Sequence, residues 1–156
     1  QQGVRGFIFK KDSPSCGAFR VKLYRGKQAS RDGVGIFADY IQKNWPNLPV
    51  EEEGRLNDAR LRENFIQRVF QYDRWQRFRE EGPTVARLMT FHAEHKYLFL
   101  SHNQTASRNL GRLVAKATSK TLNEVLDDYE DLMMSAPSEI SENQLKELNL
   151  ALKLKK

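Results

Sequence analysis

The sequence predicts an α+β or α/β fold, in which a small N-terminal sheet-containing half-domain is followed by an all-helical region. Short apolar stretches of strand length occur in about the first 50 residues, whereas from residue 57 onward the apolar side chains follow helical spacing. The chain has 156 residues, of which 39% are hydrophobic and 29% are charged. This composition suits one globular domain or two small ones.

The first part of the chain is expected to hold two strands and one short helix. Residues 6–10 are apolar enough for a buried strand, and residues 19–24 alternate apolar and charged side chains as a half-exposed strand does. Residues 25–35 are polar and glycine-rich and predict a loop. A short helix is expected over residues 36–45, and residues 46–55, which contain two prolines, are expected to be irregular.

The second part is expected to be helical throughout. Asn57 or Asp58 is suited to cap the first helix. That helix carries two apolar stripes, one through Phe65 and one through Ile66 and Phe70, and is expected to bury both. Five helices are expected, over residues 57–78, 83–101, 105–117, 121–134 and 141–156.

The net charge of +6 lies entirely in the first 50 residues, which hold nine Lys and Arg against three Asp. An anionic partner such as a phosphate, a nucleotide or RNA is the natural inference. The alternative is that the balancing acidic residues lie in a missing part of the protein. The apolar runs are far shorter than the ~20 residues that cross a bilayer, so no membrane association is expected.

Cys16 is the single cysteine of the chain and lies between Ser15 and Gly17, just after a proline turn. Small residues in a tight turn can present a reactive or metal-binding sulfur. A lone sulfur cannot build a metal site, however, and the usual role of an isolated cysteine is that of a small buried hydrophobe. One cysteine also excludes an internal disulfide and fits a reducing, cytoplasmic location.

The three histidines, His92, His95 and His102, lie close together in the helical part. A metal site is conceivable there. Because no Cys, Asp or Glu stands convincingly in phase with them, a partly buried polar seam that hydrogen-bonds to neighbouring helices is favoured. A phosphate site with the basic side chains nearby is a further alternative.

Two sets of motifs resemble known families. The first consists of GFIFKKDSPSCGAFRVKLY, GVGIFADYI, PNLPVEEEGRLND and LRENFIQRVFQYDRW, and it resembles the C-terminal half of the TudS-like thiouracil desulfidase family. The second consists of LMTFHAEHKYLFLSHNQ and LGRLVA, and it resembles the N-terminal part of a YbgA-like helical domain. The resemblance divides the chain into a desulfidase part over 1–56, a connecting helix over 57–80 and an incomplete helical domain over 81–156.

The resemblance implies an iron–sulfur-dependent desulfidase that acts on thiolated uracil or a thiouridine nucleotide. Such enzymes hold a 4Fe-4S cluster with three cysteines, and the open fourth iron takes the sulfur. Cys16 in the SPSCG motif matches the third cysteine, whereas the first two are not in this sequence. The resemblance therefore predicts a fragment whose full-length parent holds the cluster, while this chain alone holds no cofactor and is inactive.

The same resemblance nominates Ser13, Ser15 and Glu51 as catalytic residues. The two hydroxyls can donate hydrogen bonds to a cluster sulfide or a uracil oxygen, and Glu51 can donate or accept a proton. The alternatives are turn formation by the serines and, for Glu51, helix capping and ion pairs with nearby arginines.

Lys11, Arg20 and Lys22 flank the cysteine turn and are the candidates for binding a substrate phosphate. Their alternative role is to protect a solvated edge strand with charge. A non-catalytic nucleotide- or RNA-binding module is the alternative function, and a role in packing helices on a protein partner is a third. RNA as a partner and a homo-oligomer both stay open at this point.

Overall fold

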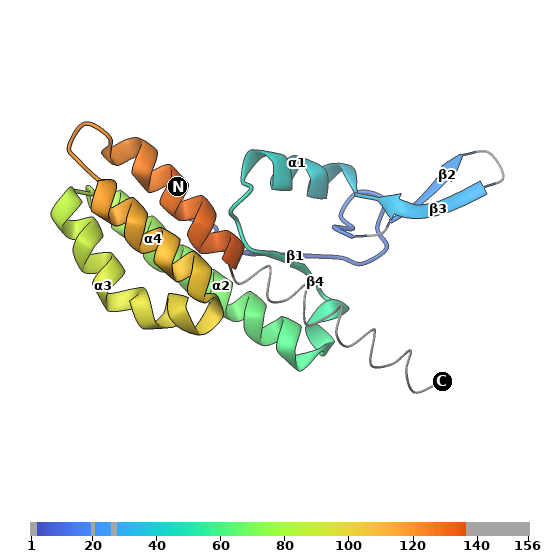
Figure 1. The fold of residues 1–156 in the computed structure, drawn as a ribbon. Coiled ribbons are helices and arrows are strands. Elements are labelled where there is room, and N and C mark those ends of the chain that lie inside the picture. The colour runs from blue at the N-terminus through green and yellow to red at the C-terminus, as the bar shows by residue number, and fades with distance from the viewer. Residues whose placement is uncertain (1–2, 20, 26–27, 137–156) are drawn as a thin grey trace. The chain divides into compact units, whose positions relative to one another are not determined.

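The computed structural model describes residues 3–19, 21–25 and 28–136. The chain divides into two compact units, Gln1–Tyr72 (unit 1) and Asp73–Lys156 (unit 2). In its described residues unit 1 combines strands and helices, and unit 2 is helical (Figure 1). The expected α+β class, with a small sheet-containing part followed by helices, is confirmed.

Unit 1 contains two separate two-stranded sheets. In one sheet β1 pairs in parallel with β4, and in the other β2 pairs antiparallel with β3. A helix, α1, lies between β3 and β4 in the sequence. The elements are β1 (Phe7–Phe9), β2 (Val21–Arg25), β3 (Gln28–Gly33), α1 (Ile36–Asn44), β4 (Val50–Glu52), the 3-10 turn η1 (Arg55–Asn57) and the start of α2 (Ala59–Glu80).

Two expectations for unit 1 are wrong. Residues 25–35 were expected to form a loop, but β3 occupies most of this stretch because β2 supplies backbone partners to a polar sequence. Residues 46–55 were expected to be irregular, but β4 forms within them. The Phe7 N–H donates to the Pro49 carbonyl at 2.9 Å, and the Glu53 N–H donates to the Phe9 carbonyl at 3.0 Å, so these bonds extend the β1–β4 pairing at both ends.

The core of unit 1 forms around Phe9, Ala18 and Ala38, which are almost completely buried. Aromatic rings from β1 and α1 meet over it, since the ring of Phe7 lies 4.7 Å from that of Phe9 and 5.7 Å from that of Phe37. Edge-on and tilted contacts of this kind add to the stability that burial provides. β1, α1 and the segment that follows Cys16 therefore each contribute a side chain to this core.

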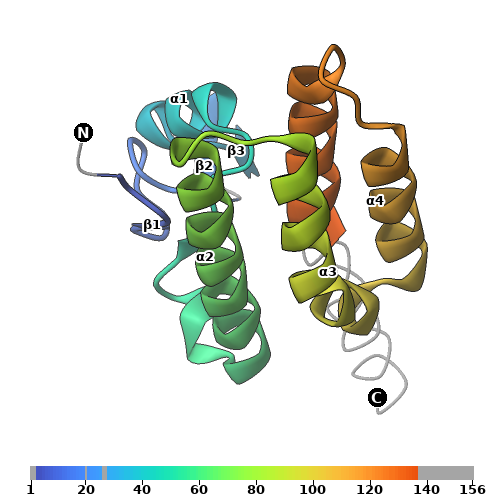
Figure 2. The ribbon, with the colours of Figure 1, turned by 90° about the vertical axis from the view of Figure 1, so that its left-hand side faces the viewer.

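Unit 2 is a set of helices packed around aromatic rings. It contains the end of α2, α3 (Val85–His102), α4 (Gln104–Lys116) and a further helix over residues 122–136. Figure 2 shows α3, α4 and the helix over 122–136 side by side. The fully buried rings of Trp75 and Tyr129 stack at 5.1 Å with an interplanar angle of 16°, and Phe91 meets Trp75 edge-on at 5.3 Å.

Four of the five expected helices are confirmed with ends shifted by at most two residues. The Asp58 carboxylate caps α2 by accepting the N–H groups of Arg60 at 2.8 Å and Leu61 at 3.1 Å. The expected helix over 141–156 lies outside the described residues. Within the described residues, none of the helices is long and apolar enough to span a membrane.

The two apolar stripes of α2 differ in solvent exposure. Phe65 is buried at 8% exposure, whereas Ile66 and Phe70 are exposed at 46% and 58%. Phe65 lies close beneath Gly6, where an added Cβ would stand 3.4 Å from the ring. The expectation that both stripes are buried is therefore wrong for the part of the second stripe that Ile66 and Phe70 form.

We expect Phe65→Ala to lower the free energy of unfolding by about 3–5 kcal/mol, because it removes a buried ring and leaves a cavity. Phe70→Ala is the matched control on the same helix and should change it by about 0.5 kcal/mol or less, as exposed substitutions usually do. Urea denaturation followed by far-UV circular dichroism measures both. Equal effects of the two substitutions would contradict the burial of Phe65.

Candidate functional site

Cys16 lies in a tight turn between β1 and β2 that Ser13 organises. The Gly17 N–H donates to the Ser13 carbonyl at 2.8 Å. The Cys16 N–H donates to the Ser13 hydroxyl oxygen at 3.2 Å. A serine that binds the backbone three residues later is a common way to close such a turn. Hydrogen bonds within residues 13–17 therefore fix the backbone conformation at Cys16.

The start of α1 holds the same turn from a second direction. The Ser15 carbonyl accepts the N–H of Phe37 at 2.9 Å and that of Ala38 at 3.4 Å. The first N–H groups of a helix have no partner within the helix, so the Ser15 carbonyl satisfies two of them. This contact requires glycine at position 35, because a Cβ there would stand 2.5 Å from the Ser15 carbonyl.

A buried carboxylate holds the segment that follows Cys16. Glu52 of β4 is only 2% exposed. Its Oε1 accepts the N–H groups of Ala18 at 2.9 Å and of Phe19 at 3.0 Å. Burying a carboxylate is costly unless hydrogen bonds replace its water, and two backbone donors do so here. Glu52 therefore ties β4 to the exit of the cysteine turn.

Glu53 holds the segment that precedes Cys16. Its Oε2 accepts the N–H of Lys11 at 2.8 Å, and its own N–H donates to the Phe9 carbonyl at 3.0 Å. We call Glu51, Glu52 and Glu53 the carboxylate clamp. Two members of the clamp, adjacent in sequence, thus bind the entry and the exit of the cysteine turn.

Glu51 is the third member of the clamp and is 6% exposed. It accepts the Arg55 Nε–H at 2.6 Å, and the Arg55 guanidinium lies 4.9 Å from the centre of the Phe19 ring. Burial lowers the pKa of Arg68 from its ordinary value, and the negative charge of Glu51 opposes this shift. The structure thus places Glu51 in an ion pair, the alternative to proton transfer, and its catalytic role stays a prediction.

The Cys16 residue is partly buried and packs against the core around Phe9, Ala18 and Ala38. The Ser15 hydroxyl oxygen lies 3.5 Å from the sulfur and 3.2 Å from the Ser13 hydroxyl oxygen. Three of the candidates, Ser13, Ser15 and Cys16, are therefore brought together as a chain of polar atoms. Cys16 thus combines packing against an apolar core with a hydroxyl close to its sulfur.

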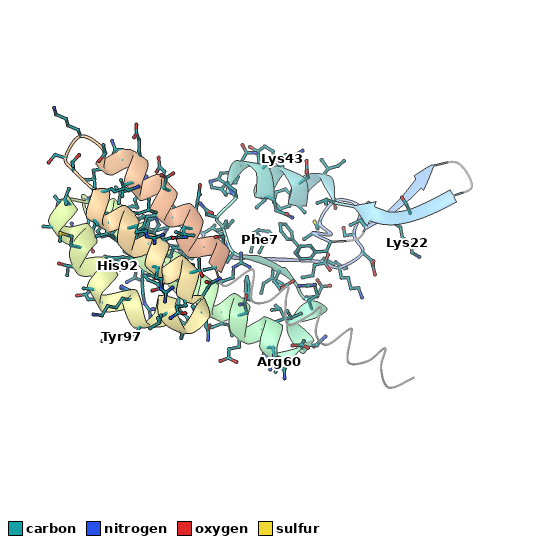
Figure 3. The ribbon with its side chains drawn as sticks, in the orientation of Figure 1. Phe7, Lys22, Lys43, Arg60, His92 and Tyr97 are labelled. Carbon is teal, nitrogen blue, oxygen red and sulfur yellow. The ribbon has the colours of Figure 1, made fainter. Side chains whose placement is uncertain are left out.

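The candidates for phosphate binding are only partly described. Lys11 and Lys22 are exposed, and Figure 3 shows Lys22 on the β2–β3 hairpin. Arg20 lies outside the described residues. Exposed lysines are available to an anion, but no measured contact links them to the sulfur, so their role stays a prediction.

The cluster that the resemblance implies does not fit the residues of this chain by themselves. Thiolates are the usual ligands of a 4Fe-4S cluster, and Cys16 is the one cysteine in the sequence. The part of the chain that the structure describes contains no group of three or more His, Cys, Asp or Glu side chains placed to hold a metal ion. Cys16 can supply one ligand only.

The histidines of unit 2 form the expected polar seam in part. His92 (Figure 3) lies on α3, and its Nδ1 shares a hydrogen bond of 3.0 Å with the hydroxyl oxygen of Tyr129 on the helix over residues 122–136. His95 Nδ1 is 2.8 Å from the Phe91 carbonyl of its own helix, and its ring stacks on that of Phe91 at 4.3 Å. The buried Nε2 of His102 has no hydrogen-bond partner among the described residues.

Burial also shifts the protonation of this seam. It lowers the pKa of His92, with the nearby Lys96 charge adding to the effect, and it lowers the pKa of His102. It raises the pKa of Tyr129 well above its ordinary value. The imidazoles of His92 and His102 are therefore held in their neutral form more strongly than in an unfolded chain, and Tyr129 keeps its proton.

Sequence reasoning missed several polar residues that organise the two units. The sequence showed Glu52 only as part of an acidic run and did not indicate that its side chain binds the backbone after Cys16. In unit 2, Glu130 accepts the Trp75 indole N–H at 2.8 Å and the Gln76 amide at 3.1 Å. Burial raises the pKa of Glu130. The sequence signal for the buried role of Glu130 was its position directly after Tyr129, which lies on the apolar stripe of the same helix.

The site in unit 1 is that of a protein segment that presents one thiol from a fixed turn. Residues 1–53 match the family model described as 2-thiouracil desulfurase. Residues 96–151 match the model described as a protein of unknown function (DUF1722), in the region where the YbgA-like resemblance lies. No curated protein and no solved structure matches the chain. The first match supports the desulfidase resemblance, and the second carries no function.

We expect the free energy of unfolding to fall as the pH is lowered through about 6.5, the ordinary pKa of histidine. A histidine with a lowered folded pKa stays neutral while the unfolded chain takes up a proton, so acid favours unfolding. Urea denaturation between pH 8 and about pH 5 measures the slope. His102→Gln should have a smaller slope than the unchanged protein, and identical slopes would contradict the assignment.

Proposed function

We propose that residues 1–53 are the part of an iron–sulfur desulfidase that carries one of its cluster cysteines, and that the substrate is thiolated uracil or its nucleotide. The observation that carries the proposal is the match of this segment to the 2-thiouracil desulfurase model. The other thiolates would come from outside these 156 residues, because the sequence contains one cysteine.

The geometry of the cysteine turn supports this assignment. A ligand must be held within a narrow range of positions if it is to bind a cluster together with ligands from elsewhere. The backbone around Cys16 is bonded to the Ser13 side chain, to the start of α1 and to Glu52. Hydrogen bonds within unit 1 therefore hold the turn from three directions.

Ser13 and Ser15 would act next to the sulfur. Their hydroxyls are 3.2 Å apart, and that of Ser15 also lies near the sulfur, so they can orient one another and donate to an acceptor on a bound substrate. Exposed Lys11 and Lys22 would attract the phosphate of a nucleotide substrate. In this proposal Glu51 keeps the turn in shape through Arg55, with proton transfer as its second role.

We expect the 156-residue chain, reconstituted anaerobically with iron and sulfide, to show no charge-transfer absorbance of a 4Fe-4S cluster in the visible region. One thiolate per chain is too few to hold four irons. Absorption spectroscopy together with iron and sulfide analysis measures this. A stoichiometric cluster in a monomer would contradict the proposal, and sedimentation would show whether cysteines of several copies had been pooled.

The activity itself is tested on the polypeptide in which these residues occur, as established by intact-mass measurement of the protein from its source. We expect release of sulfide from 2-thiouracil, and we expect Cys16→Ser to lower the rate by about 100-fold or more, since even residues that only support a metal ligand are worth 10–100-fold. Ser101→Ala, which removes an exposed hydroxyl of α3, is the control. Full activity of Cys16→Ser would overturn the role of Cys16.

A further inference from the structure

We infer that Glu52 is the positioning residue for the Cys16 thiol, with its carboxylate holding the backbone of Ala18 and Phe19 and thereby the place of the sulfur. The inference rests on the proposed function only in taking Cys16 as the functional thiol. It assigns to Glu52 a role that differs from the proton transfer predicted for Glu51.

The direction of the Glu52 side chain follows from its place on β4. Successive residues of a strand point to opposite faces, so Glu51 and Glu52 must face different parts of unit 1. Glu51 meets the guanidinium of Arg55 and accepts the Glu52 N–H at 3.0 Å, whereas Glu52 accepts the N–H groups of Ala18 and Phe19. The second carboxylate thus binds the segment that leaves the cysteine turn.

The two bonds of Glu52 lie very close to Cys16 in the chain. Ala18 and Phe19 are the second and third residues after it, and Gly17 lies between. Gly17 is itself held at both of its peptide groups, because its N–H donates to the Ser13 carbonyl at 2.8 Å and its carbonyl accepts the Gly35 N–H at 2.7 Å. A displacement of residues 18 and 19 would therefore be passed on to Cys16 rather than absorbed by the glycine.

Loss of the carboxylate would leave donors without an acceptor in a buried place. Ala18 is 2% exposed, so its N–H cannot easily reach water while the turn keeps its form. An unsatisfied buried N–H favours an opened turn in which it is hydrated. Cys16, which is partly buried against the core of unit 1, would then become more accessible to reagents.

The experiment measures the rate at which iodoacetamide alkylates Cys16 in the folded 156-residue chain. We expect Glu52→Leu to raise the rate by about tenfold or more, since one lost charge-assisted hydrogen bond can shift an opening equilibrium by that factor. Glu52→Gln keeps a carbonyl oxygen as the acceptor and should stay within about threefold of the unchanged chain. Rescue by the conservative variant separates positioning of the thiol from a general loss of stability.

Glu63→Leu is the matched control, because it makes the same change at an exposed carboxylate of α2 that is not part of the clamp. If Glu52→Leu does not fold, Glu52→Asp takes its place. It keeps the charge but withdraws the oxygen by about one bond length, and an increase in rate is again expected. Urea denaturation of each variant identifies alkylation that occurs through global unfolding.

Two results would overturn the inference. The first is an unchanged alkylation rate in Glu52→Leu, or in Glu52→Asp where it takes the place of that variant, which would make Glu52 a residue of stability alone. The second is an equal rise in Glu63→Leu. Because alkylation needs neither a cluster nor a substrate, these results are independent of the desulfidase assay, and a failure of the proposed function can be told apart from a failure of this inference.

Discussion

The arrangement of unit 1 depends on the burial of the Glu52 carboxylate. A buried carboxylate must be hydrogen-bonded, and the backbone of Ala18 and Phe19 supplies the donors. This requirement couples β4, which is late in the unit, to a segment more than thirty residues earlier. The parallel pairing of β1 with β4 brings the two parts together. The N–H groups at the start of α1 hold the cysteine turn in addition by donating to the Ser15 carbonyl.

In unit 2 the core is built mainly from buried aromatic rings, and polar groups occupy the interior positions that remain. Trp75 illustrates this, because its ring is stacked in the core while its N–H is satisfied by Glu130. Tyr129 does the same with His92. Each large ring therefore brings a polar tip into the interior, and each tip needs a partner from another helix. This packing accounts for His92 as the partner of the Tyr129 hydroxyl.

The sequence was informative where the signal is local. Helical spacing and the cap at Asp58 predicted α2 closely, because both arise within a few residues. β4 was missed because it pairs with the distant β1, which a strand with two buried glutamates does not reveal. β3 was missed because its pairing with the preceding β2 joins backbone groups of a polar sequence. For the site, the SPSCG motif identified the turn correctly. That Glu52 binds the backbone after Cys16 could not be read from the acidic run, because the direction of its side chain depends on its place in β4.

The attachment of the cysteine turn at both ends by neighbouring glutamates also bears on how such a sequence can diverge. Lys11 and Ala18 are bound by Glu53 and Glu52, which are adjacent in the chain, so the contour length between these two anchors is set. An insertion or deletion within residues 12–17 would break one anchor or strain the other. Variation in length should therefore be found outside this interval in related chains, whereas inside it change should occur by substitution alone.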